Sequence, residues 1–98
     1  MTYWKHIKTS DYDWDFFGDK HGRETSKVRT FYEGNQYIWE ADLLPNYKAE
    51  SHWHPYDIVQ IFLEGEFIAE GEGSFYPGDI RWVKAGQSTK ESAGNEGS

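Results

Sequence analysis

Short runs of aromatic and β-branched residues alternate with turn residues along the chain from Lys27 onward. They recur at intervals of about eight to twelve residues, a spacing typical of antiparallel strands in sandwiches and barrels. Apolar positions do not follow the helical period, so we expect strands rather than helices. The predicted strands cover residues 27–33, 36–44, 57–64, 66–70 and 79–83.

Two of these runs differ in how their apolar residues are distributed. In residues 36–44 one face is apolar and the other polar, as in a strand with one buried face. The face predicted to be buried consists of Tyr37, Trp39, Ala41 and Leu43. In residues 57–64 both faces are largely apolar, which is typical of a central strand covered on both sides or of a strand at a subunit interface.

Turn residues and the N-terminal region complete the predicted architecture. Pro77-Gly78 fits a type II turn, because proline presets the first central φ and glycine accepts the positive φ at the second. Short antiparallel strands in this number close best into an all-β double-sheet jelly roll or small barrel.

Residues 1–26 mix aromatic and acidic residues, and we interpret them as an N-terminal arm whose rings pack on the main domain, residues 27–98. A loose, solvated arm is the alternative.

Composition narrows the class of protein. The chain has 98 residues, no cysteine, 18% aromatic residues and a formal net charge of −7, which suits one small domain with an aromatic-rich core and, by default, a cytoplasmic location. Seventeen acidic against ten basic residues disfavour nucleic acid as a partner. No apolar run is long enough to span a membrane, and the N-terminus lacks the order of a signal peptide. We expect a homodimer that covers the strand around Val59, Ile61 and Leu63.

The segment His52-Trp53-His54 is the clearest candidate for chemistry. In an extended chain, residues two apart lie on the same face and about 6.5 Å apart, so the two imidazoles can converge on one metal ion. The same alternation adds Tyr56 and Gln60 to that face. A buried glutamine needs hydrogen-bond partners, which a metal ion or a polar ligand would supply. The alternative is that both histidines are ordinary polar residues of a loop.

Residues 46–93 resemble the two signature motifs of the cupin family, G-x5-H-x-H-x3,4-E-x6-G and G-x5-P-x-G-x2-H-x3-N. The first corresponds to NYKAESHWHPYDIVQIFLEG and the second to GDIRWVKAGQSTKESA. The match includes His52, His54 and the glycines at 65, 78 and 86, whereas Ile58 takes the position of the motif's glutamate and Thr89 that of its second-motif histidine. Further departures are Asn46, Lys84 and Ala93. The resemblance implies an all-β cupin fold, a double-stranded β-helix, over residues 27–98.

The resemblance also implies a divalent ion (iron, manganese, nickel or zinc), because a cupin metal is usually held by three histidines and one carboxylate. Here the predicted ligands are His52, His54, Gln60 and Glu72, with Glu70 and Glu91 as alternative acids. Such a centre would polarise a small oxygenated substrate or activate dioxygen beside it. Tyr56 and Gln60 are the catalytic candidates, and Tyr56 would donate a hydrogen bond to the substrate unless its ring simply fills the barrel mouth.

Three functions are compatible with these features. The His pair favours a metal-dependent, dioxygenase-like enzyme, whereas the missing glutamate and histidine favour a non-catalytic cupin that binds a small ligand as a sensor or accessory module. A structural or interaction domain with a filled barrel is the third. Four aromatic residues are predicted to line the barrel, namely Trp39, Phe62, Phe67 and Trp82. Arg81 is expected to face water, and His6 and His21 to be solvated.

Overall fold

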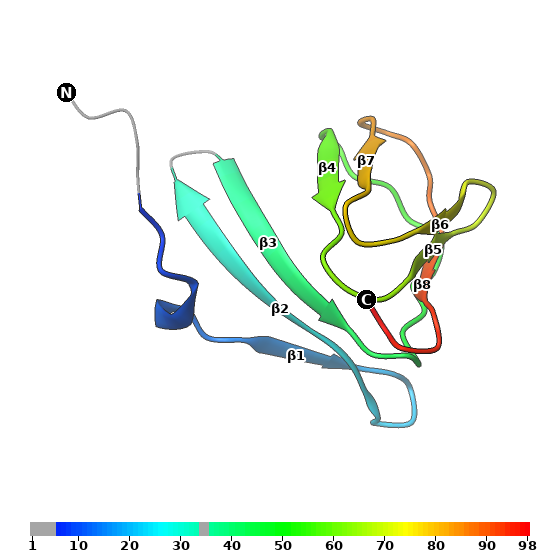
Figure 1. The fold of residues 1–98 in the computed structure, drawn as a ribbon, viewed down its shortest axis with the longest axis horizontal. Coiled ribbons are helices and arrows are strands. Elements are labelled where there is room, and N and C mark those ends of the chain that lie inside the picture. The colour runs from blue at the N-terminus through cyan, green and yellow to red at the C-terminus, as the bar shows by residue number, and fades with distance from the viewer. Residues whose placement is uncertain (1–5, 34–35) are drawn as a thin grey trace.

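The computed structural model describes residues 6–33 and 36–98, and these residues form a mostly β protein with antiparallel sheets (Figure 1). The predicted all-β class is confirmed. A single 3₁₀ turn, η1 (Thr9–Asp11), precedes the described strands, which are β1 (Asp15–Gly18), β2 (Glu24–Glu33), β3 (Gln36–Leu43), β4 (Ile58–Ile61), β5 (Phe67–Ala69), β6 (Gly73–Phe75), β7 (Ile80–Val83) and β8 (Glu91–Ala93). No helix within the described ranges has the length and apolar character needed to cross a lipid bilayer.

The N-terminal sheet has the order β1-β2-β3, and its two longer strands project away from the smaller strands (Figure 1). β2 starts at Glu24 and therefore runs across residue 26, the predicted end of the arm. Two rings of the arm pack on this sheet. Tyr12 lies edge-on to Phe31 with ring centroids 4.7 Å apart, and the guanidinium carbon of Arg29 lies 4.2 Å from the ring centroid of Trp14.

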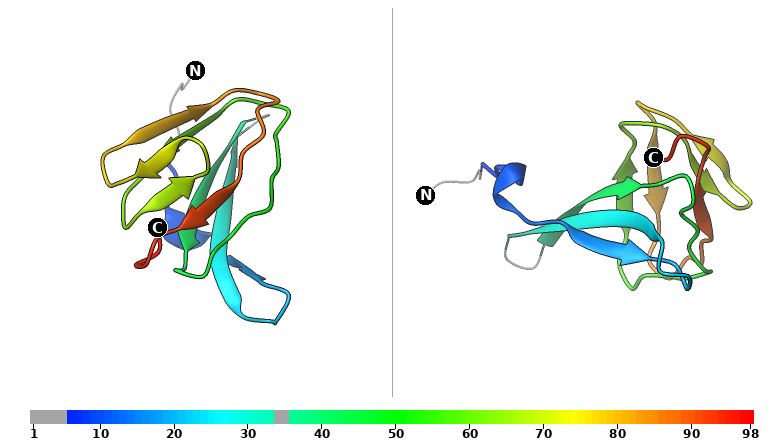
Figure 2. Two further views of the ribbon diagram at one scale, coloured as in Figure 1. Left: turned by 90° about the vertical axis from the view of Figure 1, so that its right-hand side faces the viewer. Right: turned by 90° about the horizontal axis from the view of Figure 1, so that it is seen from below.

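The other strands form a smaller body (Figure 2), in which the buried cluster lies. β4 pairs with β7, and β5 lies between β6 and β8. The buried cluster consists of Phe62, Phe67 and Ala69, and Leu43 and Phe75 pack against it. Leu43 is also joined to the C-terminal residue by two backbone hydrogen bonds of 2.7 and 2.8 Å. The end of β3 is therefore fixed to the body by both packing and hydrogen bonds.

The predicted closed barrel is not found. In the part of the chain that the structure describes, the strands form three separate sheets. The predicted strand at 57–64 shortens to four residues, and β6 and β8, which the sequence pattern does not reveal, have three residues each. Strands this short make few ladder hydrogen bonds, so they do not extend around a complete barrel.

The predicted turn at Pro77-Gly78 is confirmed. Gly78 has a φ of 94°, and the N–H of Asp79 donates to the carbonyl of Tyr76 at 2.9 Å, as a type II turn requires. The carboxylate of Asp79 accepts a hydrogen bond from the N–H of Tyr76 at 2.8 Å. This turn precedes β7 and helps to direct it back along β4.

Two predicted lining residues are exposed. Phe62 and Phe67 are buried as predicted, but Trp82 is 64% exposed and Trp39 is 42% exposed. In β7 the side chains alternate, so Trp82 must point away from the body if its neighbour Arg81 points inward. Trp39 belongs to the projecting part of β3, where the described body covers it only in part. The side chain of Tyr37 lies outside the part that the structure describes.

Candidate functional site

Arg81 lies at the centre of the candidate site, and the expectation that it faces water is wrong. It is 3% exposed and lies opposite Gln60 in the antiparallel pair of β4 and β7. The same register places Ile58 opposite Val83. Because side chains of a strand alternate between its faces, Gln60 and Arg81 point into the body together with these two apolar residues.

Each of the five N–H groups of Arg81 has an acceptor. Nε donates to Glu72 Oε1 at 2.9 Å, and Nη1 donates to Gln60 Oε1 at 2.8 Å. Nη1 also donates to Glu91 Oε2 at 2.5 Å, and Nη2 donates to Thr89 Oγ1 at 2.7 Å. A second bond from Nη2 to Glu72 completes a bidentate pair. This complete set of acceptors explains why the guanidinium is buried, because burial of an unpaired charge would be far more costly.

Two carboxylates keep the guanidinium of Arg81 charged, and two aromatic rings lie beside it. The guanidinium carbon of Arg81 lies 5.6 Å from the ring centroid of Phe67 and 5.8 Å from that of Phe75. Burial lowers the pKa of Arg81, but its hydrogen bonds to Glu72 and Glu91 outweigh that effect and raise the pKa overall. The hydrogen bond from Arg81 lowers the pKa of Glu72 against the opposing effect of desolvation. The network therefore contains a persistent cation.

The predicted metal ligands Gln60 and Glu72 are both engaged by this cation. A divalent ion at their oxygens would lie beside the positive charge of Arg81, and at such distances the repulsion amounts to several kcal/mol. These two residues therefore do not fit a metal ion in this arrangement. Within residues 6–33 and 36–98, no group of three or more histidine, cysteine, aspartate or glutamate side chains is placed to hold a metal.

His52 and His54 lie on one face, as the alternation predicts, with ring centroids 5.2 Å apart. The backbone of His52 exchanges two hydrogen bonds with Thr89, of 3.0 and 2.8 Å. Its Nδ1 lies 2.7 Å from the carbonyl oxygen of Glu50. A carbonyl oxygen can only accept a hydrogen bond, so the Nδ1–H of His52 is the donor. Its Nε2 faces Glu91 Oε1 at 3.5 Å. Glu91 thus lies between His52 and Arg81.

Three rings form a cluster beside this network, and we call Trp39, His54 and Tyr56 the ring cluster. The ring centroid of Trp39 lies 5.9 Å from that of His54 and 6.4 Å from that of Tyr56. The rings of His54 and Tyr56 are 5.5 Å apart and tilted by 30°. Trp39 and Tyr56 are both partly exposed. The cluster therefore presents aromatic surface to solvent next to the interior hydrogen bonds.

The two alternative acidic ligands, Glu70 and Glu91, lie in different surroundings. Glu91 joins the network of Arg81, whereas Glu70 is largely exposed and its carboxylate lies 3.9 Å from the ammonium of Lys90. His6 and His21 are exposed, as predicted. Sequence reasoning missed Arg81 and Thr89 as parts of the site. One signal in the sequence could have found Arg81. Gln60 and Glu91 are hydrogen-bond acceptors on inward-facing positions, and buried acceptors need a donor.

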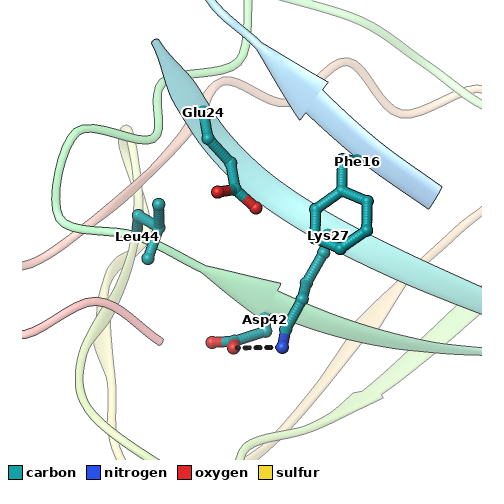
Figure 3. Close-up of a pocket in the computed structure, with 5 residues that line it drawn as sticks. All are labelled: Phe16, Glu24, Lys27, Asp42 and Leu44. Carbon is teal, nitrogen blue, oxygen red and sulfur yellow. Dashed lines mark ion pairs between the residues drawn. The ribbon is translucent and has the colours of Figure 1, made fainter. Parts of the chain in front are cut away.

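A hollow of about 290 Å³ lies away from this site, on the N-terminal sheet (Figure 3). It is lined by Phe16, Glu24, Lys27, Asp42 and Leu44, and the ammonium of Lys27 approaches the carboxylate of Asp42 at 3.8 Å. None of its lining residues belongs to the Arg81 network or to the ring cluster. Its exposed ion pair is typical of a solvated sheet face, so we assign it no function.

Comparisons of this chain with protein-family profiles, with curated proteins and with solved structures found no match. The resemblance to cupins therefore remains a prediction from the motifs.

Proposed function

We propose that this chain is a non-catalytic, cupin-like β-domain that binds a small planar ligand at the ring cluster. The position of Arg81 is the main support, because its guanidinium takes up oxygens of Gln60, Glu72 and Glu91. In a metal-dependent cupin, oxygens near the histidines would serve the ion. Here these oxygens instead accept hydrogen bonds from the guanidinium of Arg81, which fixes the position of β7 beside the ring cluster. The cupin-type double-stranded β-helix is part of this proposal, supported by the motif-like segments that contain β4, the turn at Gly78 and β7.

The rings and the local charge indicate the chemical class of the ligand. Tryptophan, tyrosine and histidine rings bind flat molecules by stacking, and their polar edges add hydrogen bonds. In the neighbouring Arg81 network, the carboxylates of Glu72 and Glu91 outnumber the single guanidinium of Arg81. The field there disfavours an anion. The proposed ligand is therefore a small aromatic or heteroaromatic molecule that is neutral or weakly cationic.

Titration with three small probes of similar size tests the ligand class. Nicotinamide is planar and neutral, benzoate is planar and anionic, and cyclohexanecarboxamide is neutral but not planar. In two-dimensional ¹H–¹⁵N NMR spectra, nicotinamide should shift the indole signal of Trp39 and the amide signals around Tyr56 at millimolar concentration, while the other two probes shift them less. Equal shifts by all three probes, or no shift by any of them, would contradict the proposal.

A matched pair of tryptophan variants locates the binding surface. Trp39→Ala removes one ring of the cluster and should abolish the shifts caused by nicotinamide. Trp53→Ala is the control, since Trp53 lies between the two histidines but its side chain is largely exposed. It should leave the shifts unchanged. Loss of binding in Trp53→Ala with binding retained in Trp39→Ala would place the ligand elsewhere.

One observation favours the metal-dependent enzyme as a second candidate. His52 donates from Nδ1 to a backbone carbonyl, which is the arrangement that orients a histidine to bind a metal through Nε2. That atom and Glu91 Oε1 are 3.5 Å apart, and the ring of His54 is close by. With iron, manganese, nickel or zinc bound, this candidate would act on a small oxygenated substrate, with Tyr56 as hydrogen-bond donor.

Metal retention separates the two candidates. Purified protein is dialysed against each of the four ions and then against buffer, and bound metal is measured by elemental analysis. The non-catalytic proposal predicts far less than one ion per chain, and no difference from a variant with both His52→Ala and His54→Ala. Retention of about one ion per chain that disappears in the double variant would favour the enzyme.

A further inference from the structure

We infer that the outward face of β4 and β7 is the interface through which two copies of this chain associate. This outer face consists of Val59 and Ile61 on β4, Ile80 and Trp82 on β7, and Leu63 just after β4. All five side chains are more than half exposed. Val59 lies opposite Trp82, and Ile61 lies opposite Ile80, so the large apolar side chains form one continuous surface.

The outer face differs from the other exposed sheet surface in its charge. On the N-terminal sheet, side chains form ion pairs between Lys27 and Asp42 and between Arg29 and Glu40. Those charges are solvated in the single chain and would lose water on association. The five side chains of the outer face are apolar, and the carboxylate of Asp57 lies at its edge, 3.4 Å from the indole nitrogen of Trp82. Most of this surface can therefore be buried without this cost.

The chain as a whole exposes more surface than a compact monomer of its mass. The solvent-accessible surface is 7591 Å², whereas a folded monomer of 11.5 kDa is expected to expose about 5,800 Å². The radius of gyration is 14.5 Å, compared with about 13 Å for a compact domain of this length. The excess surface exceeds the roughly 800 Å² per partner that a standard stable interface buries. The single chain thus has enough unburied surface for an extensive dimer.

A second copy is the occupant that these features favour. The chain carries a net charge of −7, so repulsion between two copies is weakest where the contact surface carries few charges. The outer face is such a surface. Two-fold symmetry brings the same patch from both copies together, and the packed sheets would bury Trp82 of each copy against the aliphatic side chains of the other. A closed dimer of this kind would cover the exposed side chains of β4.

The oligomeric state of the full chain tests this inference directly. By sedimentation velocity at about 10 µM, the wild type should have twice the 11.5 kDa chain mass. Ile61→Lys places a charge at the centre of the outer face and should yield a monomer at the same concentration. The control is Ile38→Lys on β3, because Ile38 is the same residue type with almost the same exposure, 63% against 66% for Ile61. Circular dichroism checks that both variants are folded.

Each outcome bears on the inference. A dimeric wild type and Ile38→Lys with a monomeric Ile61→Lys support it, and so does a blue-shifted tryptophan emission of the wild type relative to Ile61→Lys. A wild type that is monomeric at about 100 µM would overturn it. Dissociation by Ile38→Lys alone would place the interface on the N-terminal sheet and overturn it as well. Assembly beyond a dimer would exclude a closed two-fold contact on this face.

Discussion

The two faces of the β4–β7 pair reverse the usual distribution of polar and apolar residues. The inward face carries Arg81 and Gln60 beside Ile58 and Val83, while the outward face carries four large apolar side chains. In most antiparallel sheets with one buried face the polar residues face water. The difference indicates that the inward face is stabilised by completed hydrogen bonds and charge pairing. The outward face is suited to contact another surface.

Removal of the Arg81 guanidinium should have the largest effect on stability. Arg81→Met leaves Glu72 and Glu91 without their counter-charge, and loss of one partner of a buried ion pair costs about 3–5 kcal/mol. Urea unfolding followed by circular dichroism measures the free energy of unfolding. The control is Arg23→Met, because Arg23 also pairs with an acid but is exposed, and it should cost less than about 1 kcal/mol.

A second variant covers the case in which Arg81→Met does not fold. Arg81→Lys keeps the charge but replaces a planar group with five donors by a single ammonium, so it should fold with reduced stability. Equal stability of the wild type and Arg81→Met would contradict the interior role of the guanidinium.

The two carboxylates that bind Arg81 should differ in their contribution. The side chain of Glu91 is 9% exposed and that of Glu72 is 42% exposed. Glu91→Gln should therefore cost about 2 kcal/mol, and Glu72→Gln about 1 kcal/mol, because solvent screens the outer pair. The same urea experiment gives both values. A larger loss for Glu72→Gln would show that the bidentate pair is the dominant contact.

Low pH should reduce the free energy of unfolding through protonation of Glu72. Its pKa in the folded protein is lowered from 4.5, first by the hydrogen bond from Arg81. A lowered folded-state pKa stabilises the protein above the unfolded-state pKa, and this contribution is lost as the pH falls below 4.5 towards the folded-state pKa. The free energy of unfolding between pH 6 and pH 3 should therefore fall less steeply for Glu72→Gln. Parallel curves for both proteins would contradict this account.

The smallest change in the free energy of unfolding is expected for a substitution on the outer face, measured in the monomer. Trp82→Ala should change the free energy of unfolding by less than about 1 kcal/mol when measured in the monomeric Ile61→Lys background, because Trp82 is largely exposed there. Phe67→Ala in the same background should cost about 3–5 kcal/mol, since Phe67 is buried in the core. Similar losses for both variants would mean that Trp82 packs within its own chain.

The sequence predicts much of the local structure and little of the inward network. The run at 36–44 corresponds to β3, the run at 66–70 contains β5, and the shared face of His52 and His54 is confirmed. These features depend on alternation between neighbouring residues, which the pattern contains. The orientation of Arg81 depends on acceptors that lie 8 to 21 residues away in the chain. The hydropathy of a single residue does not reveal such partners. Because Arg81 is predicted to face water, its neighbour Trp82 is predicted to face inward, and both predictions are wrong.

A crystal structure of the wild type grown with zinc or iron present, with anomalous data, tests the central claim most directly. The account predicts the guanidinium of Arg81 between the carboxylates of Glu72 and Glu91, with no anomalous peak within bonding distance of His52 or His54. A metal ion bound by these histidines and Glu91, with Arg81 turned out to solvent, would contradict it.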